Sequence, residues 1–207
     1  MLPSGAKLKP ADLQGEYRCS PNTIRDVLMR LSNLGLVEFQ LQRGFRATES
    51  TMRRRSDVAR FRVLLEQEGV AESMRRGGVG WEARLTGAHH KLLHIERQIA
   101  AEGDVSDYMH LWTQAEREFH ETLISACDSP LHLEAFARIY LQFRQQNVTL
   151  QRDFGPNAFE TIILEHQAIV DAAWARDEAA CRAAIFDHLK RNILAPEGAA
   201  KEDATTS

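Results

Sequence analysis

The chain has 207 residues, of which 43% are hydrophobic and 27% are charged, a balance typical of a globular protein with one or two domains. This composition excludes a chain that is disordered throughout, and no apolar run approaches the ~18 residues that span a bilayer. The N-terminal residues lack the apolar segment of a secretory signal, so we expect a cytoplasmic protein without membrane contact. The three cysteines are widely spaced, which excludes a disulfide framework and a CxxC metal site.

Charge is distributed unevenly along the chain. Residues 1–55 contain ten Lys and Arg against five Asp and Glu, whereas the remainder is acidic and brings the net charge to −3. A basic segment can attract a polyanion that the whole chain would repel; a chance fluctuation is the alternative. The polar and basic stretch 48–55 lacks periodicity and predicts a linker. We therefore expect four parts, namely a basic domain (1–47), the linker (48–55), an acidic domain (56–196) and a disordered tail (197–207).

The basic domain has the element order of a winged helix-turn-helix. A short helix is predicted over 10–17 and a longer one over 20–34. Ser20 followed by Pro21 predicts the start of the longer helix, because a serine hydroxyl caps free amides and proline is tolerated at the first position. Alternating residues on both sides of a turn predict a hairpin over 36–47. The longer helix has an apolar stripe formed by Ile24, Val27, Leu28, Leu31 and Leu34.

In such a domain the second helix enters the major groove and the hairpin contacts the DNA backbone. Arg25 can present two donors to a guanine, and the wing arginines can contact phosphate. Each residue taken alone is more often a solvated surface group, but their joint order favours DNA binding. The predicted DNA-binding residues are Ser20, Asn22, Thr23, Arg25, Arg43, Gly44 and Arg46.

The acidic domain shows helical periodicity almost throughout and no strand signal. Ser56 is expected to cap its first helix. Six helices with short connections predict an antiparallel bundle, so the whole protein is expected to be mostly α. The predicted helices cover 56–76, 81–101, 106–127, 131–150, 157–175 and 178–194.

Four ionisable residues of this bundle stand where the helical period calls for apolar ones. Glu116 and His120 lie four apart on the third helix, His166 lies on the fifth and His188 on the sixth. Burying each costs several kcal/mol unless it is paired, so they need one another or a shared ion. Such a set suits a divalent metal, Zn²⁺ first and Ni²⁺ or Mn²⁺ as alternatives. The competing interpretation for each histidine is a hydrogen-bonded core residue. Because such residues occur on three helices of one domain, a shared metal is favoured.

The other histidines of this domain fit a metal less well. His90 and His94 have the spacing of a metal pair but lie off the apolar stripe of their helix. We expect them, together with His89, to be solvated.

Several motifs resemble a known family. The segments at 2–8 (LPSGAKL), 20–31 (SPNTIRDVLMRL), 35–37 (GLV) and 43–46 (RGFR) resemble the DNA-binding domain of the GntR family of bacterial transcription regulators, and the later chain is similar to its FadR-type (FCD) effector domain. Two departures are Pro21, where the family usually has Arg, and the family's helix ahead of the LPSG segment, which this sequence lacks.

The resemblance implies a ligand-responsive repressor with a metal-binding effector domain. Its metal-binding members carry an acidic residue and a histidine four apart and one histidine on each of two later helices, so Glu116 takes the place of the usual Asp. The implied effector is a small organic acid that completes the metal coordination. Arg144 and Asn147 are the candidates for binding the rest of the acid; exposed helix residues are the alternative interpretation.

Two main function classes follow. The first is a homodimeric regulator that binds an inverted-repeat operator in double-stranded DNA. The second is a metal-dependent hydrolase or lyase, and a metal sensor is a third possibility. An enzyme needs a base near a metal-bound water, and Glu116, the best candidate for that base, is already used as a metal ligand. Glu118 or Glu165 could serve as the base only if its side chain turned inward. We therefore expect a regulator and no enzyme.

Overall fold

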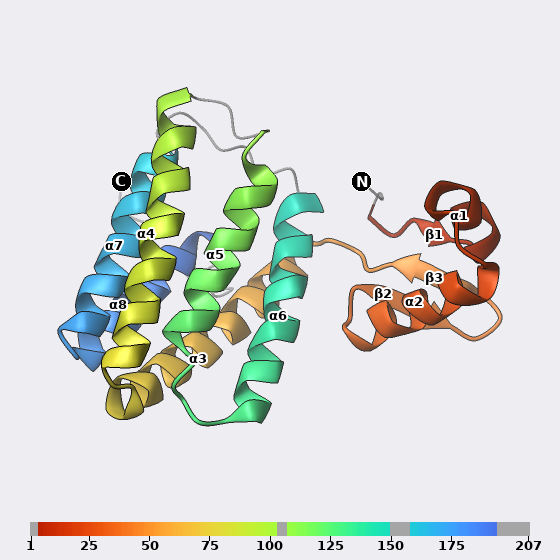
Figure 1. Ribbon diagram of the computed structural model, residues 1–207. Helices are drawn as coiled ribbons and strands as arrows, with labels where there is room; N and C mark the ends of the chain where they lie inside the picture. Colours follow the sequence, from red (N-terminus) through yellow and green to blue (C-terminus); the bar gives the residue numbers. More distant parts are fainter. Residues whose placement is uncertain (1–3, 103–106, 150–157, 194–207) are drawn as a thin grey trace, which may run out of the picture.

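A computed structural model describes residues 4–102, 107–149 and 158–193. Figure 1 shows a small winged helix on one side and a helical bundle on the other, joined by a short connecting segment. The predicted tail, 197–207, lies outside the described residues. The described elements are β1 (Lys7–Leu8), α1 (Pro10–Tyr17), α2 (Pro21–Asn33), β2 (Val37–Gln40), β3 (Gly44–Ala47), α3 (Met52–Arg76), α4 (Val79–Glu102), α5 (Met109–Leu123), α6 (Pro130–Thr149), α7 (Ala158–Trp174), α8 (Glu178–Leu189) and the 3₁₀ helix η1 (Lys190–Asn192).

The winged helix forms as its sequence predicts. Ser20 adopts an extended conformation and its hydroxyl accepts a hydrogen bond from the amide of Thr23 at 3.1 Å, which caps α2. The predicted hairpin is the antiparallel pair β2 and β3, and Gly44 begins β3 with a φ of +79°. Strand β1, which pairs with the other edge of β3, was not predicted from the sequence. A strand of two residues is too short to show alternation.

The core of the winged helix is narrower than predicted. It contains Leu8, Ile24, Leu28 and Phe45, all nearly inaccessible. Val27 was expected in the same stripe but is 46% exposed, so that assignment is wrong. The small domain covers only the face of α2 that carries Ile24 and Leu28.

The first bundle helix begins earlier than expected. Thr51 is its cap and accepts a hydrogen bond from the amide of Arg54 at 3.1 Å, whereas Ser56 is buried inside the helix. The expected cap at Ser56 is therefore wrong, and residues 52–55 belong to α3 rather than to a linker. Arginines favour helix without adding apolar periodicity, so the pattern gave no sign of this first turn.

The six predicted helices of the acidic domain are all present, with ends that differ by up to five residues. Their main core gathers apolar side chains from α3, α4, α5, α7 and α8, among them Trp81, Leu85, Trp112, Phe119 and Ile169. Helix α6 packs along α3. Within the described residues, no helix is both long and apolar enough to cross a membrane.

Candidate metal centre

Three imidazoles meet in the core of the bundle. They belong to His120 on α5, His166 on α7 and His188 on α8, and all three are buried. One ring nitrogen of each lies within 4.8 Å of those of the other two. The structure therefore brings together the three histidines that the sequence analysis selected, at a spacing from which they could converge on one ion.

A carboxylate stands behind each imidazole. In each case the Nδ1 atom lies 2.8–2.9 Å from a glutamate oxygen on a neighbouring helix; the pairs are His120 with Glu66, His166 with Glu96 and His188 with Glu165. Because a carboxylate only accepts, Nδ1 carries the hydrogen and Nε2 presents a lone pair. The buried Nε2 atoms of His120 and His166 have no hydrogen-bond partner among the described residues. Two orphaned lone pairs facing a third imidazole fit a divalent metal.

The protonation of the three imidazoles differs with their surroundings. Burial lowers the pKa of His120, and burial together with the neighbouring His166 and His120 rings holds the pKa of His188 well below its ordinary value. Burial also acts on His166, but the Glu96 carboxylate outweighs it and raises that pKa. Two of the three rings thus favour the neutral form, which is the form that binds metal.

Glu116 lies beside the three imidazoles, one turn before His120. Its Oε1 atom is 3.9 Å from Nε2 of His120 and 3.4 Å from a guanidinium nitrogen of Arg62. Its Oε2 atom accepts hydrogen bonds from the Tyr140 hydroxyl at 2.8 Å and from Arg144 at 3.2 Å. Burial alone would raise the pKa of Glu116, but Arg144 and Arg62 lower it to about 2. The carboxylate is charged, and protein donors already hold both of its oxygens.

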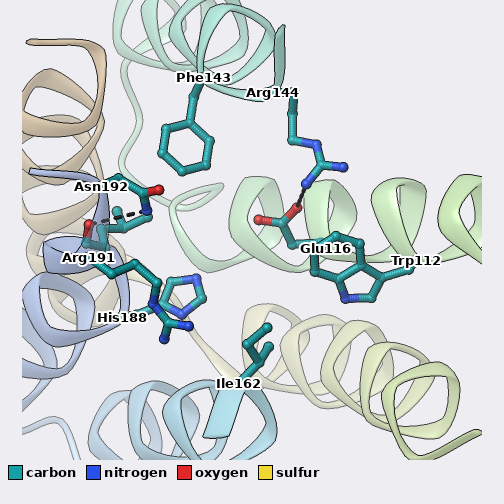
Figure 2. A pocket seen from close by; sticks show the side chains of 9 residues that line it. Trp112, Glu116, Phe143, Arg144, Ile162, His188, Arg191 and Asn192 are labelled. Carbon is teal, nitrogen blue, oxygen red and sulfur yellow. Dashed lines mark hydrogen bonds and ion pairs between the residues drawn. The ribbon is translucent and has the colours of Figure 1, made fainter. Parts of the chain in front are cut away.

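A narrow cavity opens next to these groups. Figure 2 shows Glu116 and Arg144 on one side of it and His188, Arg191 and Asn192 on the other. Its volume is about 20 Å³, which is room for roughly one water molecule. An organic acid can enter only if part of the wall moves.

Of the two predicted effector residues, only Arg144 lines this cavity. The side-chain amide of Asn147 instead donates to the carbonyl of Phe143 on its own helix at 2.9 Å. Arg191 and Asn192 were not selected from the sequence; both belong to the 3₁₀ helix η1, where the sequence predicted the last turn of a helix over 178–194.

The FCD domain family matches residues 57–191, which include all of these groups except Asn192. A relative, the uncharacterized HTH-type transcriptional regulator BphR of Paraburkholderia xenovorans, is 34% identical over 93% of this chain and 77% of its own length. The chain is an FCD-domain regulator of the GntR family. A second relative, the HTH-type transcriptional repressor GlaR of Escherichia coli, is 26% identical over 88% of this chain and 82% of its own.

Solved structures show the same fold. The regulator superposes on E. coli McbR/YncC with a TM-score of 0.73, at 20% identity over 92% of this chain and 86% of that one. The superposition on a GntR-type protein from Rhodococcus sp. RHA1 has a TM-score of 0.68, at 21% identity over 91% of this chain and 86% of that one. The two curated relatives are transcription regulators, so this FCD regulator is not the hydrolase or lyase considered as the alternative.

The predicted DNA-binding residues of the regulator lie on α2 and the wing. The side chains of Asn22, Thr23, Arg25 and Arg43 are exposed. Arg46 is also exposed, although it donates to the carbonyl of Gly5 at 3.2 Å. Ser20 and Thr23 share a hydroxyl contact of 2.9 Å at the cap. Their part in DNA binding stays a prediction.

The three histidines on α4 of the regulator divide into two groups. His90 and His94 are exposed, as expected. His89 was expected to be solvated but is only 5% exposed and packs against the rings of Phe119 and Trp174, so that expectation is wrong. His89 therefore lies on the inner face of α4, as its buried neighbour Ala88 does.

Proposed function

We propose that this FCD regulator is a cytoplasmic, homodimeric repressor whose bundle holds a divalent metal, Zn²⁺ first, and responds to a small carboxylic acid. The observation that carries the proposal is the meeting of three buried imidazoles whose Nε2 atoms point away from their glutamate partners. His120, His166 and His188 would bind the metal through Nε2, and Glu116 would supply the fourth ligand. When bound, the ion supplies a Lewis acid with open positions for an oxygen ligand.

The cavity has the charge that an organic acid needs. Arg144 and Arg191 line it from α6 and η1. Arg144 is ion-paired with Glu116 and donates to the Thr113 hydroxyl at 2.7 Å. If Glu116 turns to the metal, Arg144 loses its ion-pair partner and can take a carboxylate of the acid, for which a guanidinium is well shaped.

Helix α6 offers a route from this cavity to the winged helix. Its Gln142 donates to the carbonyl of Leu34 at 2.9 Å, and Gln145 to the carbonyl of Leu36 at 2.8 Å, just beyond the end of α2. The approach is close, since a Cβ on Gly35 would lie 2.6 Å from Nε2 of Gln142. In Figure 1, α6 lies on the side of the bundle toward the winged helix. A shift of α6 that admits the acid would therefore act on the DNA-reading helix.

An exposed apolar surface on the bundle is suited to contact with a second copy of the chain. Phe61 and Leu64 on α3 and Leu131 on α6 are 46%, 57% and 77% exposed, and a groove between the two helices is lined by Phe61, Leu131 and Ile139. Exposed apolar groups gathered on one face favour a protein contact. A two-fold dimer would also pair two α2 helices on an inverted repeat.

The DNA-reading role is tested by comparing two arginine variants. Arg25→Ala should weaken binding to an inverted repeat selected from random DNA by about 1–3 kcal/mol per half-site and relax one base position, because the guanidinium reads a guanine edge. Arg43→Ala should weaken all sequences alike, because the wing contacts phosphate. Binding is measured by fluorescence anisotropy at fixed salt. Equal losses on selected and random DNA for Arg25→Ala would contradict the base-reading role.

A further inference from the structure

We propose that Glu66, Glu96 and Glu165 are positioning residues, which fix the tautomer and orientation of the three imidazoles and so set the metal affinity of the centre. The inference rests on the proposed metal site. It assigns a task to three carboxylates that contact the imidazoles at Nδ1, the nitrogen turned away from the proposed ion, and that do not line the cavity. A carboxylate behind a metal-binding imidazole also makes that imidazole a stronger ligand.

Glu66 is held in place from both sides. Its Oε1 atom accepts from Nε of Arg62 at 2.5 Å and its Oε2 atom contacts Nδ1 of His120 at 2.8 Å, with all three side chains fully buried. Arg62 is itself packed against the rings of Phe143 and Tyr140, 4.5 and 5.0 Å from their centroids. If this carboxylate turned away from His120, the buried guanidinium of Arg62 would lose part of the negative charge that balances it.

Glu96 uses only one of its two oxygens. Oε1 accepts from the indole N–H of Trp112 at 3.1 Å and contacts Nδ1 of His166 at 2.9 Å. Oε2 is buried and has no hydrogen-bond partner among the described residues. A glutamine here can keep both hydrogen bonds through its carbonyl and place its NH₂ where Oε2 was. Glu96→Gln therefore removes the charge and retains the geometry.

Glu165 is the most accessible of the three. Its Oε2 atom contacts Nδ1 of His188 at 2.9 Å and its Oε1 atom is ion-paired with Arg191, which lines the cavity. The orientation of His188 thus depends on a residue that an incoming acid would meet. His188 is the imidazole that we expect to be least rigidly held.

A purely structural role makes a different prediction. If the carboxylates only compensate buried partners such as Arg62, their removal lowers the free energy of unfolding and leaves the metal affinity of the folded protein unchanged. A positioning role lowers the affinity itself, by roughly 10–100-fold. Metal affinity and metal-free stability must therefore be measured separately on the same variants.

The experiment compares Glu96→Gln and Glu96→Ala with wild type in the full chain. Zn²⁺ affinity is measured by competition with a chelator, and the metal-free unfolding midpoint is recorded in parallel. We expect a loss of roughly 10–100-fold for Glu96→Ala and a smaller loss for Glu96→Gln. Glu118→Gln is the matched control, because Glu118 is an exposed glutamate of the bundle paired with Lys91, and its Zn²⁺ affinity should not change.

Two results would overturn the inference. One is wild-type Zn²⁺ affinity in both Glu96 variants, whether or not their unfolding midpoints fall. The other is a proton on Nε2 rather than Nδ1 of His166 in the metal-free wild type, read from long-range ¹H–¹⁵N correlation spectra. A wild type that has the Nδ1–H form but binds no Zn²⁺ would instead contradict the proposed metal site itself, and the positioning role would fall with it.

Discussion

Bound zinc should fall from about one ion per chain to almost none when His120 or His166 is replaced by alanine. Each substitution removes one of three imidazoles within 4.8 Å of one another, and no other described histidine or cysteine lies in that group. Metal content of the purified proteins is measured by mass spectrometry, and circular dichroism checks that each variant is folded.

His90→Ala is the matched control, because His90 is an exposed histidine of the same domain. It should keep its full metal content. Full metal in both the His120 and His166 variants, together with loss in His90→Ala, would show that the wrong histidines were selected.

Replacing Gln142 and Gln145 together by alanine should uncouple the two domains without emptying either site. The pair donates two hydrogen bonds from α6 to carbonyls at the end of α2, while neither residue lines the cavity beside the histidines. We expect the variant to bind a small carboxylic acid with wild-type affinity but to lose most of the acid-dependent change in operator affinity.

Gln114→Ala serves as the control for this pair, since Gln114 is an exposed glutamine on α5. It should respond to the acid as wild type does. A full acid response in the double variant would mean that another contact connects the domains, such as that of Arg54 on α3 with the carbonyl of Gly35.

The histidines were predictable because they interrupt apolar stripes. A polar residue at a position that the helical period assigns to the core must be paired, and His120, His166 and His188 all stand at such positions. The same argument applies to Glu66, between Val63 and Val70, and to Glu96, between Ile95 and Ile99. These glutamates therefore carry the same sequence signal as the histidines.

Other features leave no mark in a single sequence. Gln142 and Gln145 are half-buried polar residues of a helix, and their hydrogen bonds to the carbonyls of Leu34 and Leu36 depend on the docking of the winged helix. His89 differs from the glutamines, because it lies four residues after the buried Leu85 and three before the buried Leu92. The helical period therefore assigns His89 to the inner face of α4, and the expectation of a solvated side chain was wrong on the sequence pattern itself. Tertiary placement, rather than local pattern, decides the two glutamines.

Reciprocal coupling between acid and operator is the measurement that tests the proposed regulation most directly. Operator affinity is measured with and without a saturating carboxylic acid, taken from a thermal-shift screen, and the affinity for that acid is measured with and without operator. We predict that both change by the same factor, typically 5–150-fold, as linkage requires. His188→Ala should lose this response and keep its binding to DNA without acid. An operator affinity that stays the same in wild type at saturating acid would contradict the account.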